Sequence, residues 1–287
     1  MADQIKRLFD LLFTTTIHRP NFDERGMYHA HSASMRSACL SRQVGAAILE
    51  EEGTLLSVGT NEVPRHGGGA YGGTVGDEDD RCFAKRGYCS NTREQNQILS
   101  DIFAKLRRAN LLSADATEAN VDRALRTTRV KALIEFSRSV HAEMDALISL
   151  TRSGTMLPPG SSLFSTTYPC HSCARHIVSS GIDRVVYLEP YAKSMAIDLH
   201  SDSIADNLPP ELAVGRVSFL PYQGVSPHLF RRVYLKTMDL KDGAGTMLPA
   251  KRSEYGPSTL WKKAYTDLER DVVQFIDRFE ESQHGAE

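Results

Sequence analysis

Two segments of this sequence carry its most specific pattern, Val140-His141-Ala142-Glu143 and Pro169-Cys170-His171-Ser172-Cys173. One histidine and two cysteines, His141, Cys170 and Cys173, give zinc three ligands and leave the fourth tetrahedral position open for water. Glu143, two residues after the histidine, is placed to move protons without binding the metal. The pattern predicts a catalytic Zn2+ site in which Glu143 is the general acid and base.

The residues around both segments predict two helices with a strand between them. Periodicity favours a helix at 141–150, a strand at 162–166 and a helix at 171–180. The ligands then lie at helix N-termini, where the helix dipole and free N–H groups favour thiolates. We therefore expect two helix N-termini to converge on one metal ion.

A Cys-x-x-Cys pair alone is weak evidence, because it also occurs in redox pairs and in structural zinc sites. A structural site needs a fourth ligand, and His171 and His176 are nearby candidates. Glu143 favours the catalytic interpretation, because a purely structural site has no use for it.

Further strands are expected on both sides of these segments. A buried-strand pattern at 43–49, a Glu-Glu-Gly turn and a returning strand at 55–59 together predict a hairpin. Strands are also expected at 183–188 and 216–220, and helices at about 4–13 and 23–41. In the second helix the expected inner positions are Met27, Ala30, Met35 and Cys39. The order predicts an α/β fold with helices on both faces of a mixed sheet.

A break interrupts this pattern at about 64–137, which we interpret as an insertion into a single domain spanning 1–287. It starts with a glycine-rich and acidic loop and continues with charged helical patterns at about 93–108 and 116–138. A C-terminal amphipathic helix is expected at about 258–282, packed on the core or on a partner subunit.

Composition excludes several classes of protein. The hydrophobic content of 41% and charged content of 24% are typical of a globular protein, and the net charge of -2 argues against stable nucleic-acid binding. No apolar run reaches the ~20 residues of a membrane span, and the start lacks a signal-peptide pattern. Five cysteines do not form a disulfide framework, so we expect a cytoplasmic protein.

The chain resembles the cytidine and deoxycytidylate deaminase superfamily. His-x-Glu followed by Pro-Cys-x-x-Cys is the signature of zinc nucleobase deaminases. The segments 42–48 (RQVGAAI), 59–64 (GTNEVP) and 166–170 (TTYPC) resemble motifs of deoxycytidylate deaminases. The resemblance implies a three-layer α-β-α cytidine deaminase-like fold, frequent oligomers and hydrolytic, zinc-dependent conversion of dCTP or dCMP to the uracil nucleotide.

A narrower resemblance, from about 11 to 235, is to the deaminase part of bacterial anti-phage deoxycytidine nucleotide deaminases. It rests on the segments 140–147, 169–178 and 189–194 and on the glycines at 67–69. This resemblance implies antiviral defence by dCTP depletion. Members of that family commonly carry an N-terminal kinase-like domain with a P-loop, whereas this sequence contains no G-x-x-x-x-G-K-[ST]. We therefore expect either a stand-alone form or a separate regulatory partner. Asp145 replaces the usual asparagine of deoxycytidylate deaminases.

Further residues are candidates for contact with a free deoxycytidine nucleotide. Asn61 is the candidate ligand of the sugar hydroxyl, by resemblance, with a turn residue as the alternative. Tyr168 is a candidate for stacking on the base or for the core. Cations that suit phosphate are Arg42, Arg65, His66 and Lys193, each of which also suits a solvated surface.

A second, structural metal site in the insertion is one of two interpretations of its cysteines. His66, Cys82 and Cys89 supply suitable ligands there, and the alternative is a pair of free thiols. Two other functions share the zinc motif: deamination of a base within RNA or single-stranded DNA, and nucleotide binding without turnover. The net charge and the lack of an aromatic-basic channel argue against the first, and Glu143 argues against the second.

Overall fold

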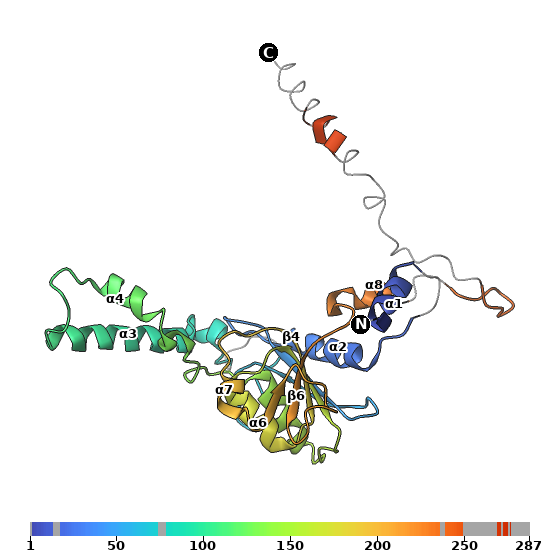
Figure 1. The fold of residues 1–287 in the computed structure, drawn as a ribbon, viewed down its shortest axis with the longest axis horizontal. Helices are drawn as coiled ribbons and strands as arrows, with labels where there is room; N and C mark the ends of the chain where they lie inside the picture. Colours follow the sequence, from blue (N-terminus) through green and yellow to red (C-terminus); the bar gives the residue numbers. More distant parts are fainter. Residues whose placement is uncertain are drawn as a thin grey trace. The chain divides into compact units, whose positions relative to one another are not determined.

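The computed structural model describes residues 2–13, 18–73, 79–235 and 239–248, together with 269, 270, 272–274 and 276. The chain divides into two compact units, one of which is Asn21–Pro227. Met1–Pro20 and His228–Glu287 make up the other. Figure 1 colours the chain from its N-terminus to its C-terminus.

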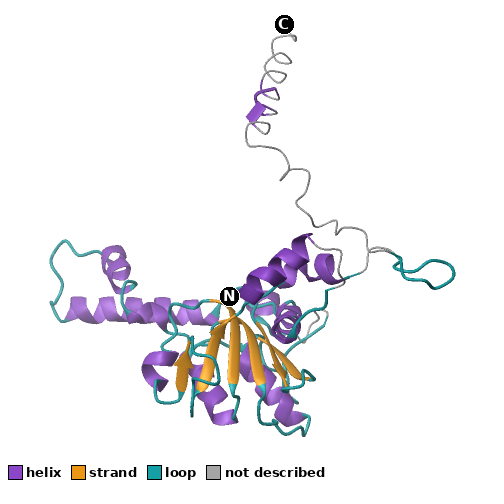
Figure 2. Cartoon of the chain, turned by 45° about the vertical axis from the view of Figure 1, so that its right-hand side comes forward, coloured by secondary structure: helices purple, strands orange, loops and turns teal. Residues whose placement is uncertain are grey.

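A six-stranded mixed sheet forms the centre of the larger unit (Figure 2). Its order is β2-β1-β3-β4-β6-β5, with antiparallel pairing from β2 through β1 to β3 and parallel pairing from β3 to β5. The strands are β1 (Gly45–Leu49), β2 (Leu55–Thr60), β3 (Ser162–Thr167), β4 (Arg184–Glu189), β5 (Ile204–Asp206) and β6 (Val217–Pro221). Because β3 and β4 are parallel, their C-terminal ends lie side by side at the same end of the sheet.

Helices cover both faces of this sheet. On one face lies α2 (Phe22–Ser34); on the other lie α5 (Ala142–Arg152), α6 (His171–Ser180) and α7 (Ala196–His200) (Figure 1). The strands alternate between the two cores. In β1, Ala46 and Ile48 pack towards α5 and α6, whereas Ala47 and Leu49 pack towards α2. The three-layer α/β fold expected from the sequence is confirmed.

Two glycines let helices approach the sheet closely. A Cβ on Gly45 would lie 2.0 Å from the Ala30 carbonyl oxygen of α2. One on Gly59 would lie 2.1 Å from the Ala142 carbonyl oxygen of α5. Because a side chain at position 59 would push the backbones of β2 and α5 apart, the glycine allows α5 to pack directly on β2.

The segment that we interpret as an insertion is largely helical. It contains a π-helical turn η1 (Cys82–Arg86), α3 (Ser90–Arg108), α4 (Glu118–Leu125) and a 3-10 turn η2 (Arg129–Ala132). Figure 1 shows α3 and α4 side by side, and the two helices pack on each other. The helix expected at 116–138 is too long, because the Thr127 and Thr128 hydroxyls donate to the carbonyls of Ala124 and Leu125 and end α4.

The second expected helix, 23–41, is also too long. It begins with a capping box between Asn21 and Glu24 but ends at Ser34. Met35, expected inside, is 67% exposed. The residues that follow Met35 bond to the loop after β2 instead of continuing the helix, since the Ser37 hydroxyl donates to the Asn61 carbonyl. Strand β5 and helix α7 were not expected from the sequence.

The smaller unit contains α1 (Ala2–Phe13) and α8 (Phe230–Tyr234), and the turn η3 (Pro227–Leu229) directly precedes α8. Arg7 donates to the Tyr234 hydroxyl at 3.1 Å. The helix expected at 258–282 lies mostly outside the described residues, although those described between 269 and 276 are helical. No helix in the described part of the chain is both long and apolar enough to span a membrane.

Candidate active site

The three predicted metal ligands lie together at the N-termini of α5 and α6. His141 is the N-cap of α5 and Cys170 is the N-cap of α6, with Cys173 in the first turn after it. The ligand atoms lie within 4.8 Å of one another. His141 Nδ1 is 3.4 Å from each of the two sulfur atoms. The described residues contain no other group of three or more such ligands this close together.

The chemistry of this group fits zinc. Two sulfurs and one imidazole nitrogen are the donor types that zinc prefers, and three protein ligands leave a position open. Hydrogen bonds from Cys173 and His141 lower the pKa of Cys170 to about 4, so its thiolate is present at neutral pH. The hydrogen bond to Cys170 also raises the pKa of His141 to about 9. The hydrogen bond to Cys170 and burial raise the pKa of Cys173, so binding of a metal ion must displace protons from both His141 and Cys173.

Glu143 lies beside the ligand group, in the first turn of α5. Its side chain is buried, with only 4% of the residue exposed, and Oε2 is 3.5 Å from Cys173 Sγ. Burial raises its pKa above the ordinary value of a glutamate. A carboxyl group with a raised pKa suits transfer of a proton in both directions.

A cavity of about 190 Å3 opens onto this group. His141, Glu143 and Cys170 line it, together with Tyr168, Tyr191 and residues from four further segments. These segments are 38–44, 61–63, 82–91 and 134–139. The last two fall within or next to the segment interpreted as an insertion, which therefore supplies a wall of the cavity. No pattern in the sequence predicts this contribution.

Asn61 lines the cavity, but its side chain is already bound to the backbone. Its Oδ1 accepts from the Val44 N–H at 2.7 Å, and its Nδ2 donates to the Arg42 carbonyl at 2.7 Å. One amide hydrogen is left for a ligand. Both readings of Asn61, as a loop residue and as a substrate contact, are compatible with this geometry.

Tyr168 and Arg42 also line the cavity. The Tyr168 ring packs edge-on against Tyr187 at 4.8 Å, and burial raises its pKa. Arg42 pairs with Glu189 at 3.4 Å and remains half exposed. The other three suggested cations, Lys193, Arg65 and His66, do not line the cavity.

The suggested second metal site has no compact arrangement. Cys82 and Cys89 line the cavity, whereas His66 does not, and the three do not form a group of close ligand atoms. The Cys89 sulfur lies 3.8 Å from the Ser41 hydroxyl, and the Cys82 sulfur lies 4.0 Å from Arg138.

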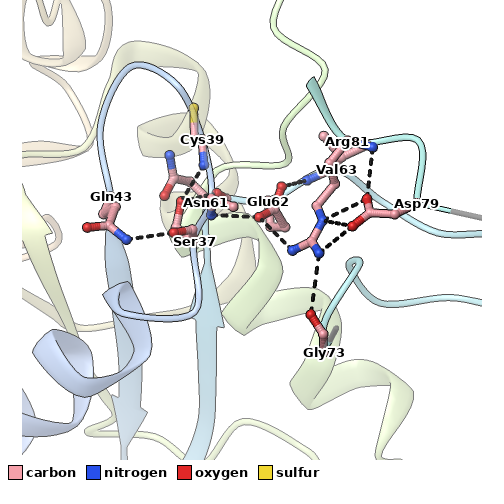
Figure 3. A network of polar contacts seen from close by, with 10 residues as sticks. Ser37, Cys39, Gln43, Asn61, Glu62, Val63, Gly73, Asp79 and Arg81 are labelled. Carbon is pink, nitrogen blue, oxygen red and sulfur yellow. Dashed lines mark hydrogen bonds and ion pairs between the residues drawn. The ribbon is translucent and has the colours of Figure 1, made fainter. Parts of the chain in front are cut away.

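Two charged residues at the cavity, Glu62 and Arg138, were missed. Arg138 donates to the Asp80 carbonyl at 2.6 Å and to its carboxylate at 3.1 Å. Glu62 is 1% exposed and occupies the centre of a polar network (Figure 3). The signal that could have identified Glu62 is a charged residue two positions after the end of a strand, as in Gly59-Thr60-Asn61-Glu62.

Asp145, the departure from the usual asparagine, has a structural partner. Its Oδ2 accepts from the Thr60 N–H at 2.9 Å, which joins α5 to the end of β2. The side chain is not among those that line the cavity.

Comparison with known proteins agrees with this site. The family model of the cytidine and deoxycytidylate deaminase zinc-binding region matches residues 20–189. The deoxycytidylate deaminase of Enterobacteria phage T4 is 28% identical over 170 residues, which cover 58% of this chain and 76% of that protein. ComE operon protein 2 of Bacillus subtilis (strain 168) is 36% identical over 55 residues, or 19% of this chain and 29% of that protein.

Among solved structures, the dCMP deaminase of cyanophage S-TIM5 in complex with dCMP and dUMP is similar. The match covers 71% of this chain and 98% of that chain, at 20% sequence identity and a TM-score of 0.39. The matched family region spans more than half of the chain and includes His141, Glu143, Cys170 and Cys173. The chain belongs to the cytidine and deoxycytidylate deaminase family, as a deaminase that hydrolyses its substrate.

Proposed function

We propose that this protein hydrolytically deaminates a free deoxycytidine nucleotide, dCMP or dCTP, to the deoxyuridine nucleotide. The observation that carries the proposal is the group of His141, Cys170 and Cys173 within 4.8 Å, beside the buried Glu143. The phage relatives named deoxycytidylate deaminase support dCMP. The motifs shared with anti-phage deaminases support dCTP and a defence role through dCTP depletion.

His141, Cys170 and Cys173 would hold the zinc ion, which when bound supplies Lewis-acid chemistry that lowers the pKa of water to about 7. Glu143 takes a proton from the attacking water and delivers protons to the ring nitrogen and to the departing amine. The net reaction exchanges the exocyclic amine for oxygen and releases ammonia. Burial of Glu143 keeps this proton transfer away from bulk water.

The cavity wall supplies candidate contacts to the rest of the nucleotide. Tyr168 packs at the base, and the remaining amide hydrogen of Asn61 reaches the sugar. Arg42 and Arg138 are the two arginines that line the cavity, and a guanidinium is well suited to phosphate oxygens. Both are held by carboxylates, Glu189 and Asp80, which orients them before a substrate binds.

The decisive experiment offers purified, zinc-loaded protein a panel of substrates. The panel contains dCTP, dCMP, CTP, deoxycytidine and a single-stranded oligonucleotide, and mass spectrometry follows the products. We expect conversion of dCMP or dCTP and no conversion by the Glu143→Ala variant. Editing of the oligonucleotide alone would replace the proposal by action on nucleic acid, and binding of dCTP without ammonia release would replace it by a non-catalytic role. Assembly into a homo-oligomer and a cytoplasmic location stay predictions.

A further inference from the structure

Three charged side chains, Glu62, Arg81 and Asp79, are buried together next to the cavity, and we call them the Glu62–Arg81 clamp (Figure 3). The exposed fractions of these side chains are between 1% and 7%. Buried charges are costly unless they are paired and hydrogen-bonded. None of the three has a part in the deamination proposed above.

Glu62 joins two loops through its carboxylate. Its Oε2 accepts from the Ala38 N–H at 2.7 Å, and its Oε1 accepts from the Val63 N–H at 2.8 Å. Its backbone carbonyl accepts from the Val140 N–H at 3.0 Å, one residue before His141. A single residue thus ties together the loop after α2, the loop after β2 and the approach to α5.

Arg81 adds the segment before α3 to this junction. Its Nη1 lies 3.7 Å from Glu62 Oε2, while its Nε and Nη2 donate to the Asp79 carboxylate at 2.6–3.0 Å. Its guanidinium also lies over the Phe83 ring, 4.9 Å from the centroid. Arg81 is therefore the cation shared by two buried carboxylates.

The joined loops all line the cavity. Ala38 comes from the first loop, Val63 from the second and Cys82 from the segment after Arg81. Asp80, within the same segment, is the acceptor that holds Arg138 at the cavity. By contrast, Glu143 and the metal ligands lie on α5 and α6, whose buried residues Ala146 and Ile177 anchor them in the core.

We propose that Glu62 and Arg81 are positioning residues that set the shape of the substrate-binding wall without taking part in the chemistry. The proposal rests on the proposed function, because it concerns how the nucleotide is held. Arg81 pulls the segment 79–82 onto Glu62, and Glu62 fixes the loops around Asn61 and Arg138. Loss of the pair opens this wall and leaves the proton transfer at Glu143 in place.

The test compares Arg81→Met, Arg81→Lys and Glu62→Gln with the wild type. We expect KM to rise by roughly tenfold in Arg81→Met while kcat per bound zinc stays within about twofold, since uniform binding is lost. Arg81→Lys keeps the positive charge but loses the forked geometry of the guanidinium. Its KM should therefore lie between the KM of the wild type and that of Arg81→Met. Glu62→Gln leaves Arg81 paired with Asp79 and is the milder variant if Arg81→Met folds poorly.

Arg86→Met is the matched control, because Arg86 lies in the same segment but forms an exposed pair with Asp80. Its KM should stay within about twofold of the wild type, as expected of a surface ion pair. Amide hydrogen exchange gives a readout that does not depend on activity. In Glu62→Gln and Arg81→Met the N–H groups of Ala38 and Val63 should exchange about tenfold faster, without a matching change in the core strands.

An unchanged KM in Arg81→Met, Arg81→Lys and Glu62→Gln, with only a lower melting temperature, overturns the proposal and makes the clamp purely structural. If the wild type converts no cytosine nucleotide, the proposed function fails instead. The role of the clamp is then tested by calorimetry, which measures the dissociation constants of dCMP and dCTP for the wild type and the variants. Weaker binding in Arg81→Met than in Arg86→Met supports it, whereas equal dissociation constants, or no binding by the wild type, overturn it.

Discussion

Glu143 differs from Asp145, the other acidic residue of α5, in what its side chain faces. It lines the cavity beside Cys173, whereas Asp145 accepts a backbone hydrogen bond from Thr60. Both carboxylates are buried on the same helix. The pair therefore allows the chemical role of a carboxylate to be separated from its structural role.

Glu143→Gln should lower kcat by roughly 10²–10⁴-fold, the usual contribution of a general acid and base. The amide has nearly the same shape but cannot carry the proton, so zinc content and melting temperature should stay close to those of the wild type. Steady-state kinetics with metal analysis measures both. Asp145→Asn is the matched control and should stay active; turnover retained in Glu143→Gln would refute the assigned role.

Cys170→Ser should abolish zinc binding and activity together. Serine can replace cysteine as the N-cap of α6, where the side chain accepts from the Cys173 N–H, so the helix should persist. A hydroxyl is a much poorer zinc ligand than a thiolate, and only two good ligands remain. Metal analysis and circular dichroism measure the two effects. Cys39→Ser, which changes another cavity-lining cysteine, should keep its zinc.

At the scale of elements, the contact between β2 and α5 sets the position of the site. Gly59→Ala would place a methyl group 2.1 Å from the Ala142 carbonyl oxygen, between His141 and Glu143. We expect a loss of about 1–3 kcal/mol in the free energy of unfolding, as for other overpacked cores, with lowered kcat. Urea denaturation measures the change in the free energy of unfolding, and steady-state kinetics measures kcat. Gly72→Ala is the control, because its Cβ would meet nothing within 4 Å; equal stability of both variants would contradict the close approach.

The elements next to the motif were predictable, because their sequence signals are local. The expected strand 162–166 and helix 171–180 agree with β3 and α6 to within one residue. The end of α2 was not predictable, because Ser37 and Ala38 bond to Asn61 and Glu62 across the fold. Helical periodicity continues through Met35, and only these distant partners show that the helix has ended.

At the scale of the whole molecule, the sequence predicted the layered fold and the residues of the metal group, but not the enclosure of the cavity. The wall that contains Cys82 and Asn91 comes from segments far from the motif in sequence. No local pattern indicates that such segments return to the site. The interpretation of 64–137 as an insertion into a single domain stays a prediction.

The larger unit contains every element of the proposed site. Its sheet, both cores, the cavity and all five cysteines lie within Asn21–Pro227. A protein reduced to these residues keeps the Asn21 cap of α2 and the hydrogen bond from the Val225 N–H to Glu24. We therefore expect it to fold, as compact units with their own core generally do, and to keep kcat/KM within about threefold of the full chain.

Metal analysis of this shortened protein should give close to one zinc ion per chain, because the described residues contain one group of three close ligands. A ratio near two would instead support a second site at His66, Cys82 and Cys89, and substituting Cys82 by serine would then lower it to one. Loss of zinc from the shortened protein, but not from the full chain, would show that the smaller unit supports the site. In that case the proposed deamination requires both units, and catalysis should fall together with metal content.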